Sequence, residues 1–288
     1  DLKEAGCVAV SDDGRPVASA RMMRRALEYA KAFDLVVIDH CEEPTLAEKA
    51  CMNEGPVSTH LGLRGQPAAG EAIMVERDVL LAELTGSRVH VAHLSAAASV
   101  DAVRRGKARG VRVTAEVTPH HLFLTDEAVR ETGYDTNTKM NPPLRSERDR
   151  EAVLAGLLDG TIDCIATDHA PHTDIEKDQP ITEAPFGMIG LETAFAVLYT
   201  RLVREGRLKL PFLIQKMTSA PAAVLNLEPR GSLEPGAPAD ITVINLDKQV
   251  KVDRQFFFSK SKNSPFDGVN FHGGPVATIV DGVVVWRR

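Results

Sequence analysis

The sequence predicts an α/β fold built from parallel βαβ units, and three observations carry this prediction. Short apolar runs, typical of buried strands, alternate with longer segments of helical periodicity. Several of these strand-like runs end abruptly in acidic residues or histidines. Beyond residue 227 the helical periodicity stops, and turn-rich, strand-like sequence follows. We therefore expect an α/β domain over 1–227 and a small β module over 228–288.

The predicted elements of the α/β domain follow one another in a regular order. Runs of four to seven mostly apolar residues, and one shorter run at the start, predict five strands: 8–10, 35–38, 89–92, 111–117 and 162–166. Segments with apolar residues every three or four positions predict helices: 18–33, 71–84, 99–109, 147–158 and 191–205. The first helix is expected to bury one face made of Met22, Ala26, Tyr29 and Phe33. Residues 44–69, with one short helix, and 171–190 are predicted to be mainly loop.

The β module is predicted from two strand-like runs, 241–245 and 276–285. The second run contains a turn signal at Asp281 and Gly282. A module this short buries its own apolar face poorly, so we expect it to need partner strands.

Composition narrows the class of protein. Hydrophobic residues make up 43% and charged residues 26% of the 288 positions, as in ordinary globular proteins. The net charge of -6 and the lack of a Lys/Arg cluster argue against nucleic-acid binding. No apolar run approaches the ~18 residues that span a bilayer, so no membrane partner is expected. The four cysteines form no CxxC pair, which favours free thiols and a cytoplasmic location.

Polar residues at four predicted strand ends suggest a shared site. Asp12 and Asp13 follow the first strand, His40 the second, His93 the third and Asp168 the fifth. In a β/α barrel the carboxyl ends of the strands meet at one face, where chemistry is placed. Taken singly, each of these residues is more typical of an ordinary turn or loop. Together they supply the imidazoles and carboxylates of a catalytic divalent metal site, which indicates metal-dependent hydrolysis.

The other histidines carry weaker signals. His60, His90 and His272 have no strand-end context and are interpreted as structural or surface residues. The pair His120 and His121 follows a strand and could touch the site, but a structural role is favoured.

Six motifs occur in an order that resembles the class I dihydroorotases of the amidohydrolase superfamily. The motifs are found at 11–14, 39–42, 93–95, 140–145, 166–172 and 185–193. The resemblance runs over essentially the whole chain. It implies a TIM-type (β/α)8 barrel with a composite β-sandwich, and a zinc site at the barrel mouth. It also implies reversible hydrolysis of dihydroorotate to N-carbamoyl-L-aspartate in pyrimidine biosynthesis, usually by a homo-oligomer.

The resemblance assigns roles to individual residues. It selects Asp13 over Asp12 as the carboxylate that bridges two zinc ions. His40 and His93 would bind one zinc, and Asp168 would bind the other and shuttle a proton. The groups that would hold the substrate are Asn141, His172 and the backbone at Phe186 and Gly187.

One family motif is absent. No His-x-His-x-Arg sequence occurs in the chain, although the family uses it for two zinc ligands and a substrate-binding arginine. The five predicted strands correspond to about strands 4–8 of the barrel. We therefore expect a piece of a longer enzyme that is inactive alone. The intact site would hold two zinc ions and this chain one or fewer.

Two alternatives stay open. A hydantoinase or allantoinase would share the metal site, but the Asn141 motif and the 185–187 loop argue against it. A non-catalytic subunit that scaffolds aspartate carbamoyltransferase would explain the absent motif, but all four remaining ligands are kept. Asn141 could also simply cap the turn before Pro142.

Overall fold

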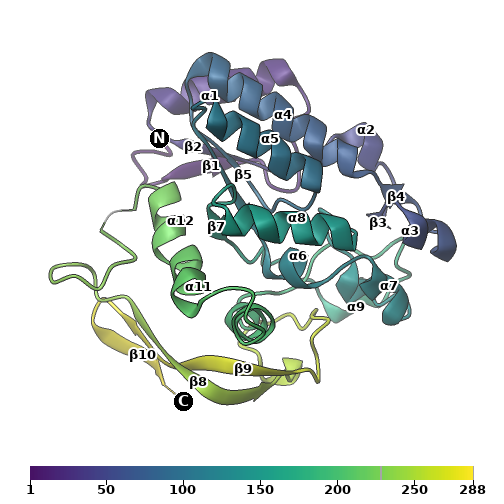
Figure 1. The fold of residues 1–288 in the computed structure, drawn as a ribbon, viewed down its shortest axis with the longest axis vertical. Helices are drawn as coiled ribbons and strands as arrows, with labels where there is room; N and C mark the ends of the chain where they lie inside the picture. The colour runs from purple at the N-terminus through teal and green to yellow at the C-terminus, as the bar shows by residue number, and fades with distance from the viewer. Residues whose placement is uncertain (228, 288) are drawn as a thin grey trace.

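The main sheet of the protein is parallel and contains the five predicted strands (Figure 1). The computed structural model describes residues 1–227 and 229–287. The strands lie in the order β1-β2-β5-β6-β7, which follows the chain apart from the short β3 and β4. Their bounds are β1 Ala9–Ser11, β2 Val36–Asp39, β5 Val89–Val91, β6 Val113–Val117 and β7 Cys164–Ile165.

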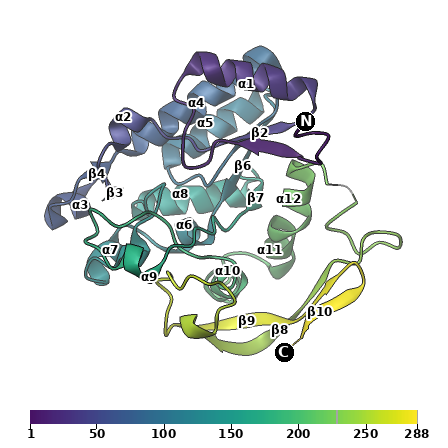
Figure 2. The same ribbon diagram turned by 180° about the vertical axis from the view of Figure 1, so that it is seen from behind.

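Four long helices cover one face of this sheet (Figures 1 and 2). They are α1 Ala20–Ala32, α4 Ala68–Thr85, α5 Ala97–Ala108 and α8 Glu147–Leu158. Side chains such as Leu27, Val79, Val103 and Leu157 are fully buried between these helices and the strands. Strand β6 shows the arrangement most clearly, because its residues alternate between buried and half-buried.

The predicted buried face of the first helix is wrong at three of its four residues, and only Ala26 packs, half-buried, against the core. Met22, Tyr29 and Phe33 are 60%, 72% and 41% exposed, whereas Met23 and Leu27 are fully buried. The two faces are rotated by one residue. Periodicity alone favoured the face with the larger side chains, Met22, Tyr29 and Phe33. The packing of α1 against the sheet and α4 instead buries the face that contains Met23 and Leu27.

Several short elements exceed the single short helix that was predicted for residues 44–69. The segment 44–69 contains α2 Pro44–Ala47, β3 Met52–Asn53, α3 Pro56–Leu61 and β4 Gly65–Gln66, and β3 pairs with β4 in parallel. Further short helices are α6 Pro119–Phe123, α7 Glu127–Glu131, α9 Asp174–Lys177, α11 Leu210–Met217 and α12 Ser219–Val224, and η1 Thr136–Thr138 is a 3-10 turn. Such elements are too short for a periodic pattern to appear. The predicted helix 191–205 forms as α10 Ala194–Leu198, which continues into the π-helical turn η2 Tyr199–Val203.

A three-stranded antiparallel sheet forms the last part of the chain. It has the order β10-β9-β8, with β8 Ile241–Lys251, β9 Asn270–Val280 and β10 Val283–Arg287. Asp281 and Gly282 have φ values of 47° and 78° and join β9 to β10, as the predicted turn requires. Over 229–287 the structure has no α-helix, only the 3-10 turn η3 Arg254–Phe256. The predicted domain boundary at residue 228 lies outside the described residues.

No helix within 1–227 or 229–287 combines the length and the apolar character that crossing a membrane demands.

Candidate metal centre at the strand ends

Three side chains from three strand ends meet at the carboxyl edge of the parallel sheet. Asp13 follows β1, His40 follows β2, and His93 follows β5. His40 Nδ1 lies 3.0 Å from His93 Nε2, and each nitrogen lies 3.5 Å from Asp13 Oδ1. Both imidazoles are buried, whereas the Asp13 side chain is 63% exposed. Two imidazole nitrogens and one carboxylate oxygen that converge in this way suit a divalent cation such as Zn²⁺.

Backbone contacts separate the roles of the two adjacent acids. Asp12 Oδ1 accepts a hydrogen bond from the His40 amide at 2.9 Å, and Asp12 Oδ2 accepts one from the Val17 amide at 2.7 Å. Asp12 therefore supports the backbone of His40, and Asp13 points toward the imidazoles. His93 has a φ of 34°, a left-handed conformation that is uncommon for residues other than glycine and often marks a functional site.

The electrostatics of the centre favour positive charge. Hydrogen bonds with His40 and then His93 hold the pKa of Asp13 far below its ordinary range. Burial by itself lowers the pKa of His40, but Asp13 and Glu42 outweigh burial and raise it to about 10. The same carboxylates would stabilise a bound cation between the two imidazoles.

Asp168 lies beside this trio without being one of its mutually close members. It follows β7 and has a φ of 45°. Burial raises the pKa of Asp168, and the opposing effect of His93 is smaller. A carboxylate whose pKa is raised by burial accepts a proton more readily than an exposed one and can later return it.

The Asn141 side chain approaches His40 Nε2, the ring nitrogen that faces away from Asp13 and His93. Asn141 Nδ2 donates to Glu42 Oε2 at 2.7 Å and lies 3.3 Å from His40 Nε2, and Glu42 Oε2 lies 3.7 Å from the same nitrogen. A carboxylate on the outer nitrogen of a ligating histidine orients the ring and makes the inner nitrogen a better ligand. The Asn141 side chain therefore faces the centre instead of capping a turn. Glu42 was missed as a functional residue, although it stands only two positions after His40.

The other predicted substrate groups form a second cluster. His172 Nε2 donates to the Phe186 carbonyl at 2.7 Å. Asn263 Nδ2 donates to the carbonyls of Ala170 and Gly187, and Asn263 Oδ1 accepts from the His172 amide. Gly187 has a φ of 116°, and a Cβ there would lie 2.5 Å from the Ala170 Cβ, so a larger residue is excluded. Asn263 was missed because its sequence context, before Ser264 and Pro265, is typical of a turn.

Two buried lysines hold the segment that carries Phe186. Lys139 Nζ donates to the Ala184 carbonyl at 2.6 Å and lies 4.5 Å from the centre of the Phe186 ring. Lys177 Nζ donates to the Pro185 carbonyl at 2.9 Å. Burial, reinforced by Lys139, lowers the pKa of Lys177 to about 8.

A buried ion pair supports the turn after His93. Glu71 Oε1 accepts from the amides of Ser95 and Ala96, at 3.0 and 3.1 Å. Arg145 donates to Ser95 Oγ at 3.0 Å, and its Nη2 lies 3.7 Å from Glu71 Oε2. The side chains of Arg145 and Glu71 are only 1% and 3% exposed. The pair links the segment 141–145 to the strand end that carries His93.

The histidine pair after β6 is structural in its contacts. His121 lies 2.8 Å from Thr118 Oγ1 and 3.0 Å from the Pro142 carbonyl oxygen. Burial lowers the pKa of His121 to about 4, so the ring is neutral at physiological pH. His120 is buried beside it.

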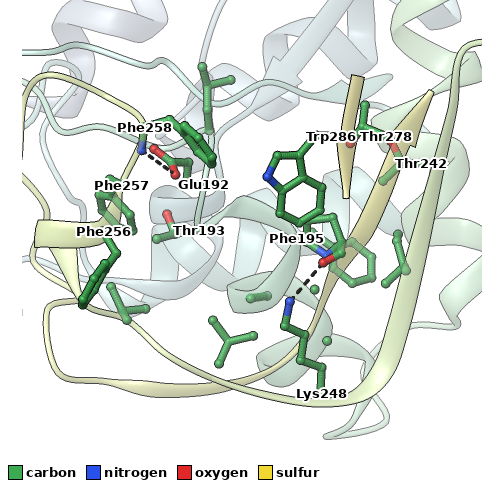
Figure 3. A pocket seen from close by; sticks show the side chains of 18 of the residues that line it. Glu192, Thr193, Phe195, Thr242, Lys248, Phe256, Phe257, Phe258, Thr278 and Trp286 are labelled. Carbon is green, nitrogen blue, oxygen red and sulfur yellow. Dashed lines mark hydrogen bonds between the residues drawn. The ribbon is translucent and has the colours of Figure 1, made fainter. Parts of the chain in front are cut away.

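A cavity of about 890 Å³ lies away from this centre, between α10, α11 and the antiparallel sheet (Figure 3). Phe195 and Trp286 line it, and Lys248 Nζ donates to the Pro275 carbonyl at its edge. Glu192 accepts from the Phe258 amide at 3.0 Å. Its lining includes none of the trio Asp13, His40 and His93, so the cavity does not belong to the metal centre.

A profile of the amidohydrolase family matches residues 2–285. The chain belongs to the amidohydrolase family. Curated dihydroorotases resemble this amidohydrolase along its whole length. The one from Pelotomaculum thermopropionicum is 59% identical over 287 residues, and the one from Carboxydothermus hydrogenoformans is 52% identical over 288 residues. Each comparison covers 100% of this chain and 66% of the relative, so the chain spans just under two thirds of their length.

Solved structures confirm the predicted fold class. An L-hydantoinase from Arthrobacter aurescens superimposes with a TM-score of 0.87 at 28% identity, over 99% of this chain and 66% of that one. A dihydropyrimidinase from Brevibacillus agri NCHU1002 gives the same TM-score at 20% identity, over 99% and 65%, and supports the fold alone. The parallel sheet is thus part of a TIM-type barrel, and the antiparallel sheet is part of a β-sandwich. Metal dependence is general in this family, and the amidohydrolase described here has side-chain groups that could hold a metal ion.

Proposed function

We propose that this chain carries the metal centre of a dihydroorotase, which hydrolyses dihydroorotate reversibly to N-carbamoyl-L-aspartate in pyrimidine biosynthesis. The observation that carries the proposal is the identity of 51–59% with dihydroorotases over nearly every residue of the chain. The convergence of Asp13, His40 and His93 supports it, because opening a cyclic amide needs an electrophile beside the carbonyl.

The ligand set fits zinc. Imidazole and carboxylate ligands suit this ion, and Glu42 is placed to orient His40 from behind. Zinc, when bound, would polarise the amide carbonyl and lower the pKa of water toward ~7. Asp13 would bridge to a second position at Asp168. Because the chain contains no His-x-His sequence, we propose that this centre holds at most one zinc ion in the chain by itself, on His40 and His93.

The remaining residues move the proton and hold the substrate. Asp168 would take the proton of the attacking water and pass it to the leaving ring nitrogen, since its raised pKa suits both steps. Asn141 and His172 would bind the polar edges and the carboxylate of the ring, beside the backbone at Phe186 and Gly187. We also propose a homo-oligomer, and a cytoplasmic location, which the four free cysteines favour.

The experiment that tests the function compares two substrates. The product of the complete reading frame containing these residues is assayed with dihydroorotate and with an uncharged hydantoin. Dihydroorotate should be preferred, and Asn141→Ala and His172→Ala should reduce its turnover while metal content stays unchanged. A site built to bind a polar group rejects analogues that lack it by up to ~10⁴–10⁵-fold. If the hydantoin is preferred, or if neither substitution changes dihydroorotate turnover, a hydantoinase-type activity replaces this proposal.

Zinc analysis after dialysis separates the enzyme from the non-catalytic alternative. We expect one zinc at this centre of the 288-residue chain, lost in His93→Ala and kept in the exposed control His60→Ala. Loss of two ions in His93→Ala would contradict the ligand assignment, because this centre is expected to hold one. A chain that binds no zinc but captures aspartate carbamoyltransferase would support the scaffolding alternative.

A further inference from the structure

The parallel sheet carries a second group of metal-ligating side chains, on the face opposite the helix-packed core. In β6, Val113, Ala115 and Val117 are buried against the helices, so Thr114 and Glu116 point to the other face. Strand register extends this face to both neighbours. His90 of β5 pairs with Thr114, and Cys164 of β7 pairs with Glu116. Three adjacent strands thus present an imidazole, a carboxylate and a thiol side by side.

The three ligand atoms are close together. His90 Nε2 lies 3.1 Å from Glu116 Oε2, and His90, Glu116 and Cys164 each offer one ligand atom within 4.8 Å of the other two. Tetrahedral zinc, with bonds of about 2.0–2.3 Å, holds its ligand atoms about 3.3–3.8 Å apart. Small side-chain rotations would therefore close the set around an ion. His90 and Cys164 are 2% and 1% exposed, whereas the Glu116 side chain is 19% exposed, which leaves a route for entry.

The surroundings prepare His90 for coordination. Its Nδ1 lies 2.8 Å from Thr114 Oγ1, so a hydrogen bond there orients the ring and directs Nε2 toward Glu116 and Cys164. Imidazole, thiolate and carboxylate together suit zinc and ions of similar softness better than magnesium or calcium. Burial raises the pKa of Cys164, so binding an ion would release the thiol proton.

A third candidate group lacks this fit. Asp39, Cys41 and Asp78 are also mutually close, but Arg77 Nε already donates to Asp78 at 2.7 Å, and Arg77 Nη2 lies 3.6 Å from Asp39. The guanidinium already supplies these carboxylates with a positive charge. Within the described residues, the His90 ring contacts Thr114 and Glu116 and neither lysine nor arginine, and Lys216 and Lys107 act on Cys164 through their charge alone.

We propose that His90, Glu116 and Cys164 form a second metal site, for Zn²⁺ or a divalent ion of similar softness, separate from the centre at Asp13, His40 and His93. The ion would join β5, β6 and β7 three residues before His93. This site does not depend on the proposed function, because it rests on the strand register and on ligand chemistry alone.

Cobalt(II) titration of the metal-free 288-residue chain tests the site. The trio Asp13, His40 and His93 contains no sulfur, so a thiolate-to-cobalt charge-transfer band in the near ultraviolet can come only from a cysteine-containing site. We expect this band in the parent chain and its bleaching by added Zn²⁺. Cys164→Ser should abolish it, and Cys51→Ser, a control at another buried cysteine, should keep it.

A second variant guards against misfolding of Cys164→Ser, which circular dichroism would reveal. Glu116→Gln keeps the shape of the side chain and should weaken cobalt binding, read from the same band, by about tenfold or more. Absence of the band in the folded parent chain would overturn the proposal. Its persistence in folded Cys164→Ser, its loss in Cys41→Ser alone, or unchanged affinity in Glu116→Gln would do the same.

Discussion

The two larger sheets of this protein differ in how far they bury the same residue type. In β5, Val89 and Val91 are 1% and 0% exposed, whereas Val283, Val284 and Val285 of β10 are 57–63% exposed. Valine has the same strand propensity in both places. The difference arises because helices α4 and α5 cover the parallel sheet, and β10 lies at the edge of a three-stranded sheet. Burial therefore follows from the layers around a strand and not from its residues.

The contrast also runs along a single strand. Phe271, near the start of β9, is fully buried and packs edge-to-face on Phe266 with ring centroids 5.7 Å apart. Val280, at the other end of β9, is 45% exposed. The antiparallel sheet is thus anchored at one end only, whereas β2, β5, β6 and β7 of the parallel sheet are mostly buried and its edge strand β1 is partly exposed. The metal centre lies at the carboxyl edge of the parallel sheet. Substitutions matched between the two regions can test this division.

The largest expected effect is on catalysis. In the complete enzyme, Asp168→Asn should lower kcat for dihydroorotate by about 10²–10⁴-fold, because it removes the group that moves the proton. Glu192→Gln, in the cavity beside the antiparallel sheet, should leave kcat within about threefold of the parent. Steady-state kinetics on both variants, with circular dichroism to verify folding, measures the difference. Equal losses of kcat in the two variants would contradict the placement of the catalytic residues at the parallel sheet.

The next effect is on stability. Arg145→Ala leaves Glu71 as a buried charge without its partner and should cost about 3–5 kcal/mol of unfolding free energy. Arg104, whose side chain is 42% exposed and pairs with Asp101 and Asp159, is the matched control. Arg104→Ala should cost about 0–1 kcal/mol. Urea unfolding of both variants gives the comparison, and similar losses would show that the buried pair contributes no more than a surface one.

Val91→Ala should cost about 2–3 kcal/mol, from two lost methyl groups and the cavity they leave. The variant is measured by urea unfolding beside Val284→Ala, which makes the same change in β10. A cost below about 1 kcal/mol would mean that the core relaxes around the smaller side chain.

Stability should depend on pH through Lys177. Its pKa is about 8 in the folded protein against 10.5 as the ordinary value, so the folded state binds fewer protons than the unfolded state between these limits. The penalty for burying the ammonium is present below pH 8 and is relieved as the pH rises toward 10.5. Lys177→Met should remove a rise on the order of 1 kcal/mol over this window, after allowance for solvent screening. Lys251→Met, at an exposed lysine of β8, should leave the profile unchanged. An identical profile in Lys177→Met would contradict the prediction.

The smallest expected effect is at Val284. Val284→Ala should change the unfolding free energy by no more than about 0.5 kcal/mol, because the side chain is 57% exposed. A cost close to that of Val91→Ala would show that β10 is covered in solution, for example by another copy of the chain. Light scattering at several protein concentrations would then show whether the chain self-associates.

Local patterns predicted much of the fold and part of the site. The five strands of the parallel sheet, the long helices and the turn at Asp281 and Gly282 are set by neighbours in the chain, so the sequence carries them. The convergence of Asp13, His40 and His93 was expected because the carboxyl ends of parallel strands share one edge. Asn263 and the partners Glu71 and Arg145 were not predicted, since their contacts join segments 24 to 93 positions apart.

The sequence by itself determined which segments become strands and helices and which of them end in metal-binding side chains, because backbone preference and periodicity act over a few residues. Only the tertiary structure decided that α1 buries Met23 and Leu27 instead of Met22 and Tyr29. It also decided that Asp12 braces the backbone while Asp13 faces the imidazoles, and that the valines of β10 stay exposed. These outcomes depend on which layers pack against each element, and adjacent residues of the same character cannot encode that choice between them.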